Sequence, residues 1–204
     1  MKKLLFLFLI LLLTSCSITF HKKINFDFQP QTKTSLLHYL DSSKVDYQIA
    51  DLATLKDTTV FRAFAVKNNL PIPHAYFFNK DGYQVEDNFK GTRCGQVINN
   101  AEKINTAPAI TTEHIDNWIK DFTFLEKSDL GSQNYDATVI LTWGLYAKKE
   151  APTINDTGFK WYKSLKEKYS GMKIRIIFLN LDFQRNWFIE GESEQSESTG
   201  NITQ

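Results

Sequence analysis

The residues of this sequence that could carry out covalent chemistry are its two cysteines, Cys16 and Cys94. A thiolate is the attacking group in thiol chemistry, and both a helix N-terminus and a neighbouring arginine lower the pKa of a thiol. Cys94 follows Arg93 at the predicted start of a helix, which makes a reactive thiol physically feasible there. The alternative is that Cys94 is a small, partly buried thiol without a chemical role.

The four histidines do not predict a metal site. His74 directly follows Pro73 in a predicted loop, and His21, His38 and His114 show no ligand spacing relative to it. The sequence also contains no glycine-rich phosphate loop and no Gly-x-Ser-x-Gly nucleophile motif. We therefore expect no metal and no cofactor.

The first 15 residues have the order of a secretory signal peptide. Lys2 and Lys3 precede an apolar run over 4–13, which is too short to cross a hydrocarbon core. The next residues end in Leu-Thr-Ser-Cys16, which resembles the lipobox of bacterial lipoproteins. This resemblance implies a signal peptide over 1–15 and a lipid such as palmitate on Cys16, which would hold the protein at a membrane of the bacterial cell envelope. The alternative is a buried N-terminal helix with an ordinary cysteine.

Charge and composition exclude some partners. Residues 1–15 contain two of the 24 basic residues and none of the 23 acidic residues, so the rest of the chain is close to neutral. No run of Lys and Arg predicts binding to nucleic acid. The residues after Cys16 do not form an acidic cluster, and we therefore expect a domain that faces the periplasm. With Cys16 lipidated, Cys94 has no partner for an internal disulfide bond.

Composition also divides the chain. The aromatic content of 14% favours a well-filled core. We expect a tether over 16–33, one folded domain over 34–190 and a tail over 191–204. The tail is rich in Glu, Ser, Gln and Thr, and such a composition predicts disorder because it cannot bury enough apolar surface.

Hydrophobic periodicity predicts an α/β fold, with a mixed sheet and helices on both of its sides. The region 137–181 reads as two strongly buried strands around an amphipathic helix, which predicts a parallel crossover. A Lys-Asp-Gly turn at 80–82 predicts a hairpin. The predicted strands are 45–52, 75–79, 83–89, 137–143 and 173–181, and the predicted helices are 34–43, a helix capped by Asp57 that runs to 69, 93–104, 115–122 and 156–169.

The stretch LTWGLYAKKEAP, at 141–152, resembles the active-site motif of thioredoxin-like proteins, in particular the membrane-tethered periplasmic branch related to TlpA. Thr142, Trp143, Lys149, Glu150 and Pro152 match that motif directly. The amphipathic helix and the strand that follow the motif are also similar to those of the family.

The two cysteines of this motif are missing, because Gly144 and Ala147 stand at their positions. Disulfide exchange needs one thiolate that attacks and a second thiol that releases the mixed disulfide. The resemblance therefore implies a protein without the redox chemistry of the family but with its groove for an extended peptide. The binding residues that it implies are Pro73, His74, Trp143, Gly144, Leu145, Tyr146 and Ala147.

An earlier region, 60–103, resembles the second half of a thioredoxin-like domain. It has a helix, an Ile-Pro loop, a strand, an Asp-Gly hairpin and a last helix, and the resemblance implies that the Ile72–Pro73 bond is cis. The two halves thus occur in reversed order. One explanation is a circularly permuted domain with a single sheet, and the other is a pair of incomplete units. We favour one joined core, because neither half has enough strands to cover its faces.

These patterns leave three functions open. The leading hypothesis is a redox-inactive, thioredoxin-like lipoprotein that binds another envelope protein or a peptide. A second hypothesis is an enzyme, either a thiol oxidoreductase or a peroxidase that uses Cys94. The third is a structural component of an envelope assembly, which predicts an exposed apolar patch away from the Pro73 loop.

The lipid anchor can be tested in bacteria that produce the full chain. We expect the protein to incorporate labelled palmitate and to stay in the membrane fraction, because several acyl chains on one cysteine hold a protein firmly at a bilayer. Cys16→Ser should abolish the label, whereas Cys94→Ser should leave it unchanged. Equal labelling of the wild-type protein and Cys16→Ser would contradict the assignment.

Overall fold

Strand β6 (Ala137–Trp143) lies at the centre of the fold, and all seven of its residues are buried. It is part of a seven-stranded sheet with the order β4-β3-β2-β6-β7-β1-β5. An apolar strand without alternation is typical of a strand that is covered on both faces, and this is what the sheet requires of β6.

In the computed structural model of the protein, the described residues are 28–86, 101–126, 135–149, 151–169 and 171–188. The helices are α2 (Lys33–Ser42), α3 (Thr58–Val66), α5 (Ile115–Ile119) and α6 (Asp156–Lys168), with short 3-10 helices η1 (Ile49–Asp51) and η2 (Ala101–Lys103). The other strands are β1 (Leu52–Leu55), β2 (His74–Asn79), β3 (Tyr83–Val85), β4 (Ala109–His114), β5 (Phe122–Phe124) and β7 (Ile174–Asn180).

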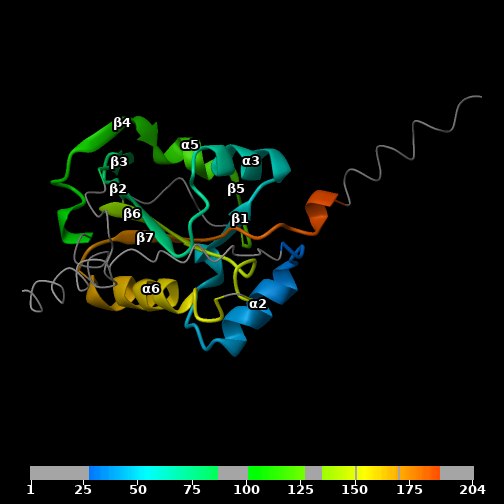
Figure 1. Ribbon diagram of the computed structural model, residues 1–204. Helices are drawn as coiled ribbons and strands as arrows, with labels where there is room; N and C mark the ends of the chain where they lie inside the picture. Colours follow the sequence, from blue (N-terminus) through cyan, green and yellow to red (C-terminus); the bar gives the residue numbers. More distant parts are fainter. Residues whose placement is uncertain (1–27, 87–100, 127–134, 150, 170, 189–204) are drawn as a thin grey trace, which may run out of the picture.

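Helices cover both faces of this sheet, as Figure 1 shows. Helices α2 and α6 lie on one face and pack Leu36, Leu40 and Trp161 against β6 and β7. Helices α3 and α5 lie on the opposite face, where Phe64 and Trp118 join a second core cluster. The predicted α/β class, with a mixed sheet and helices on both sides, is confirmed.

The C-terminal part of the prediction is confirmed in detail. Strands β6 and β7 are parallel and are joined by α6, whose apolar stripe is buried at Trp161, Tyr162 and Leu165. The predicted bounds of these three elements agree with the observed ones to within one residue.

One sheet contains strands from both halves of the sequence. Strand β2 pairs with β6 in the antiparallel direction along its whole length, from His74 opposite Thr142 to Asn79 opposite Ala137. The predicted hairpin is also present, since β3 follows β2 through a turn in which Gly82 has a φ of +82°. The two halves therefore share a single core.

The predicted strand over 45–52 is wrong, because the strand forms only at its end. Val45, Tyr47 and Ile49 do alternate and pack against the core, but their backbone leads into η1. The Tyr162 hydroxyl accepts a hydrogen bond from the Gln48 amide at 3.0 Å, so this amide is not available to a neighbouring strand. Pairing with β7 begins at Leu52.

Two edge strands were not predicted. Strand β4 forms where no strand was predicted, and three of its six residues are exposed while the other three are half-buried. Strand β5 lies where the predicted helix over 115–122 should end, so only its first turn and a half, α5, is helical. Short, exposed strands carry little hydrophobic periodicity, and pairing with β3 and β1 forms them.

Some predictions lie outside the described residues. They include the lipobox with Cys16, the tail, most of the helix over 93–104 and Cys94 itself. Within the described ranges, no helix is both long enough and apolar enough to cross a membrane.

Candidate functional site

The candidate site lies where the parallel strands β6 and β7 end. Ligands of open α/β sheets bind preferentially outside the carboxyl ends of the strands. The turn over 144–147 follows β6 at this edge, and the Leu181 amide donates a hydrogen bond to the Trp143 carbonyl there at 2.9 Å. Strand β2 begins at the same edge, because His74 is paired with Thr142.

The loop that carries Pro73 lies next to the end of β6. The Ile72–Pro73 bond is cis, as predicted. The Thr142 hydroxyl donates to the Pro71 carbonyl at 2.7 Å and accepts from the His74 amide at 2.9 Å. A Cβ atom added to Gly158 in α6 would lie 3.3 Å from the Pro73 Cβ, so a glycine lets the helix approach this proline.

The space at Gly144, where the motif would carry its first thiol, is taken by the ring of Tyr146. A Cβ atom added to Gly144 would lie 2.6 Å from Tyr146 Cε1. This ring cannot move freely, since it stacks on Phe28 with 5.1 Å between centroids and its hydroxyl donates to the Leu70 carbonyl at 2.7 Å. The turn is therefore built around a glycine.

A buried carboxylate holds the turn in place. The Asp182 side chain accepts hydrogen bonds from the Leu145 amide at 2.8 Å and from the Tyr146 amide at 2.9 Å. The Asn180 side chain donates to the same carboxylate at 2.7 Å. Burial raises the pKa of Asp182 from 3.8 to about 6, although its three donors act in the opposite direction. At neutral pH the Asp182 carboxylate that holds the turn is therefore ionised although it is buried.

Buried amides complete this polar network. Asn155, which directly precedes α6, does not cap the helix with its side chain but accepts from the Gly144 amide at 3.2 Å and donates to the Gly144 carbonyl at 2.8 Å. The Gln184 side chain donates to the Asn180 side chain at 3.1 Å and to the Asp182 carbonyl at 2.8 Å. The network satisfies the buried polar groups and fixes the backbone of the turn.

The structure brings the predicted binding residues together at one edge but exposes few of them. Trp143, Gly144, Tyr146 and Ala147 are buried, whereas Pro73, His74 and Leu145 are half-buried. Asn155, Asn180, Asp182 and Gln184 were not predicted as site residues. They could have been recognised in the sequence as polar residues that directly follow a buried strand or precede a helix.

An aromatic cluster lies beside the turn. It connects the two ends of the described chain, because Phe28 and Phe183 stack at 5.1 Å and both contact Phe61 of α3. Its members, with centroid separations of 4.7–6.1 Å, are Phe28, Phe61, Tyr146, Phe183, Trp187 and Phe188. Phe188 is 45% exposed, and Phe28, Phe61, Phe183 and Trp187 are half-buried. Aromatic side chains at a surface are typical of protein contacts.

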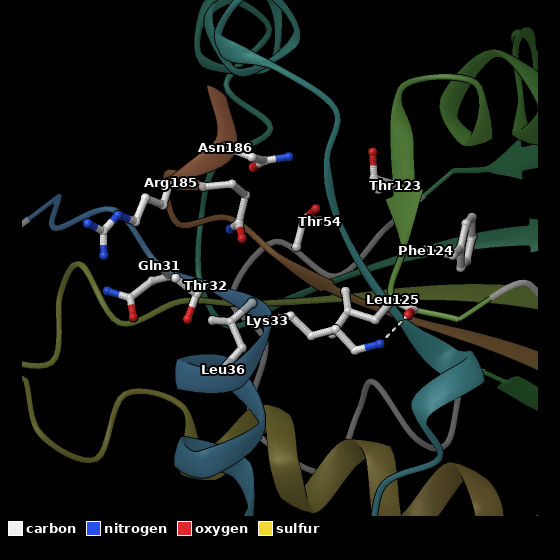
Figure 2. Close-up of a pocket in the computed structure, with 11 residues that line it drawn as sticks. Gln31, Thr32, Lys33, Leu36, Thr54, Thr123, Phe124, Leu125, Arg185 and Asn186 are labelled. Atoms are coloured by element: carbon white, nitrogen blue, oxygen red, sulfur yellow. Dashed lines mark hydrogen bonds between the residues drawn. The ribbon is translucent and has the colours of Figure 1, made fainter. Parts of the chain in front are cut away.

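A cavity of about 410 Å³ opens at the same edge of the sheet, beside the start of α2 (Figure 2). Leu36, Phe124 and Leu125 supply apolar walls. Thr54 and Gln184, both 6% exposed, supply polar groups at the ends of β1 and β7. The cavity and the 144–147 turn thus share the Gln184 network.

The described residues offer no site for a metal ion, since no group of three or more His, Cys, Asp or Glu side chains gathers among them. His74 contacts the ring of Tyr76, and His114 lies near Tyr83 on the β3–β4 side of the sheet. The expected absence of a metal and of a cofactor stays a prediction for the whole chain.

Comparison with known proteins gave no significant match to a family model, to a curated protein or to a solved structure.

The packing of the turn can be tested with Gly144→Ala. We expect this change to lower the free energy of unfolding by about 1–3 kcal/mol, because the added methyl group overlaps the fixed Tyr146 ring. Gly171→Ala is the matched control, since nothing lies within 4 Å of its added Cβ. Urea denaturation of the two variants measures the difference, and equal stabilities would contradict the described packing.

The buried Asp182 carboxylate predicts that the free energy of unfolding depends on pH in an unusual direction. Because the folded state raises the pKa of Asp182 to about 6, this group binds a proton more tightly in the folded chain than in the unfolded chain. Its contribution to the free energy of unfolding should therefore fall as the pH rises from about 4 to 6, by about 3 kcal/mol, and stay constant above that range.

Asp182→Asn cannot titrate, so the stability difference between wild type and variant isolates this effect. We expect the wild type to lose on the order of 3 kcal/mol relative to Asp182→Asn between pH 4 and pH 7 in urea denaturation. A difference that does not change with pH would show that the carboxyl group has the same proton affinity in both states.

Proposed function

We propose that this chain is a lipid-anchored, redox-inactive, thioredoxin-like protein that binds another protein or an extended peptide in the bacterial cell envelope. The observation that carries the proposal is the turn over 144–147. It occupies the place of a dithiol motif, yet its first thiol position is filled by the Tyr146 ring and its backbone is fixed by Asp182 and Asn155.

The arrangement of strands supports a permuted thioredoxin-like domain over two separate units. The strand that begins with His74 pairs directly with the strand that ends at Trp143. This pairing places the Pro73 loop opposite the turn, as the resemblance in sequence implies. A protein that keeps both features without the thiols retains the elements that position a peptide in that family.

One exposed apolar side chain, Phe188, supports a binding surface next to the turn. Among the described residues, the large hydrophobic side chains that are exposed are Val66, Tyr83 and Phe188. Phe188 belongs to the aromatic cluster that includes Tyr146 of the turn. A structural component would instead favour a broad apolar patch far from the Pro73 loop. We therefore place the partner over Leu145, His74 and the aromatic cluster.

The proposal can be tested with a photo-cross-linking amino acid at Leu145 in the full, lipid-anchored chain inside cells. We expect one discrete adduct with an envelope protein or peptide, and no such adduct from Lys163, an exposed control position on α6. Truncation of a hot-spot residue near the centre of an interface weakens binding about tenfold or more, so we expect His74→Ala to lower the adduct yield by roughly tenfold.

A reductase assay on the same protein separates the proposal from the enzyme hypothesis. We expect no catalysed reduction of a protein disulfide, with or without Cys94→Ser, and an unchanged adduct at Leu145 in that variant. Turnover that disappears in Cys94→Ser would instead favour the thiol enzyme. Equal adducts from Leu145 and Lys163 would exclude the turn as the binding surface.

A further inference from the structure

A second cavity, of about 270 Å³, opens beside the first half of β7. Strand β1 pairs with β7 only from Leu52, which lies opposite Phe178. Within the described ranges, the earlier residues of β7 therefore have no strand partner on the β1 side. Arg175 of β7, Asp51 of η1 and Lys166 of α6 line the cavity at this place.

The Arg175 side chain lies between two aromatic rings. Its guanidinium carbon is 5.7 Å from the ring centroid of Phe124 and 5.8 Å from that of Tyr135. The face of an aromatic ring attracts a cation but supplies no oxygen acceptor for the five N–H donors of a guanidinium. The two rings therefore position the cation and leave its donors available.

One of these donor groups is buried without an acceptor. The Nη2 atom of Arg175 is buried, and no residue that the structure describes accepts a hydrogen bond from it. Burial lowers the pKa of Arg175, which indicates a guanidinium that has lost part of its hydration. Native proteins seldom retain a buried donor without a partner, and each such group needs an explanation. An acceptor oxygen of a ligand would supply the missing partner.

The guanidinium is able to turn toward the cavity. Arg175 and Tyr135 both line it, and no hydrogen bond or ion pair to a described residue fixes the guanidinium in its present orientation. Rotation about the last bonds of the side chain would then aim two parallel N–H groups at a ligand. Such a planar pair of donors matches the two oxygens of a carboxylate.

The charges around the cavity favour a ligand with one negative charge. Asp51 is the acidic residue of the lining, and its carboxylate accepts hydrogen bonds from the Tyr162 hydroxyl at 2.6 Å and from the Lys166 ammonium at 3.2 Å. Lys166 therefore neutralises Asp51, and the positive charge of Arg175 stays uncompensated in the described part of the protein.

The other walls favour a small apolar part on the ligand. Leu165, Met172 and Ile174 line the same cavity. A volume of about 270 Å³ lies just below the range of drug-sized ligand sites, so the ligand should have few carbon atoms.

We propose that this cavity binds a small organic carboxylate, whose two oxygens accept hydrogen bonds from Arg175 and whose apolar part contacts Leu165 and Ile174. The site lies at the start of β7, whereas the 144–147 turn lies at the end of that strand. It is therefore separate from the surface proposed for a protein partner and does not depend on that proposal.

Calorimetric titration of the full chain in lipid nanodiscs, with empty nanodiscs as the reference, tests this site. The probes are propanoate and benzoate, their neutral primary amides, and inorganic phosphate. We expect at least one of the two carboxylates to bind about tenfold or more tightly than its amide, because the amide loses the charge-assisted hydrogen bonds. Inorganic phosphate lacks the apolar part and should bind more weakly than the preferred carboxylate.

Two variants and one control assign the site to Arg175. Arg175→Met keeps an apolar stem between the rings, and we expect carboxylate binding to weaken about tenfold or more. Its thermal stability should not fall, because the buried donor has no protein partner to lose. Arg175→Lys keeps the charge without the planar pair of donors and should weaken binding about three- to tenfold. Arg62→Met, an exposed change on α3, should leave binding unchanged.

Several outcomes would overturn the proposal. They are an absence of binding by both carboxylates at millimolar concentration, equal affinity for carboxylate and amide, tighter binding of phosphate than of both carboxylates, and unchanged carboxylate binding in Arg175→Met. The Leu145 adduct should persist in Arg175→Met, so failure of this site is distinguishable from failure of the proposed protein contact.

Discussion

The pairing of β6 with a neighbour on each side is the constraint on which the rest of the structure depends. Its parallel pairing with β7 requires α6 as a crossover, and its antiparallel pairing with β2 brings in the first part of the chain. Because every residue of β6 is buried, both faces must be covered, and the helices divide into two pairs to do this. The Pro73 loop and the 144–147 turn meet only because β2 and β6 run in opposite directions. A shift of register by one residue would separate them and would also reverse the buried face of β2.

The polar network at the end of β6 supplies hydrogen-bond partners for the backbone amides that follow this strand. A strand that ends inside the protein leaves backbone amides without partners, and the turn that follows offers them no sheet neighbour. Asp182 and Asn155 accept from these amides, at the cost of burying one carboxylate. The same groups hold Gly144 and Tyr146 in a fixed geometry, so the backbone of the turn is rigid. If the proposed partner binds here, a preformed turn would lose little conformational entropy on binding.

The parts of the fold that the sequence predicts are those with strong local patterns. The wholly apolar β6 and the stripe of α6 predict their own structure, and the Lys-Asp-Gly turn predicts the β2–β3 hairpin. The strand expected at 45–52 failed because alternation alone does not reveal that Tyr162, which is distant in sequence, takes the hydrogen bond of Gln48. Edge strands β4 and β5 have mixed exposure and exist through pairing with distant partners. The sequence likewise predicts one part of the site and not the other. The motif at 141–152 marks the turn. Nothing local assigns Asp182 and Asn155 to it, since each binds a backbone more than ten residues away.

The position of the chain's described start connects the proposed anchor with the proposed binding surface. The Gln31 amide donates to the Phe183 carbonyl at 2.7 Å, and Phe28 stacks on Tyr146 of the turn. The polypeptide therefore enters the fold beside the aromatic cluster and the cavity at the start of α2, not at the far side of the sheet. Phe28 is the twelfth residue after Cys16, and an extended chain of that length spans at most about 40 Å. A lipid on Cys16 would thus keep Phe28, which stacks on Tyr146 of the turn, within about 40 Å of the bilayer surface. Such a tether would raise the local concentration of a partner that is held at the same membrane.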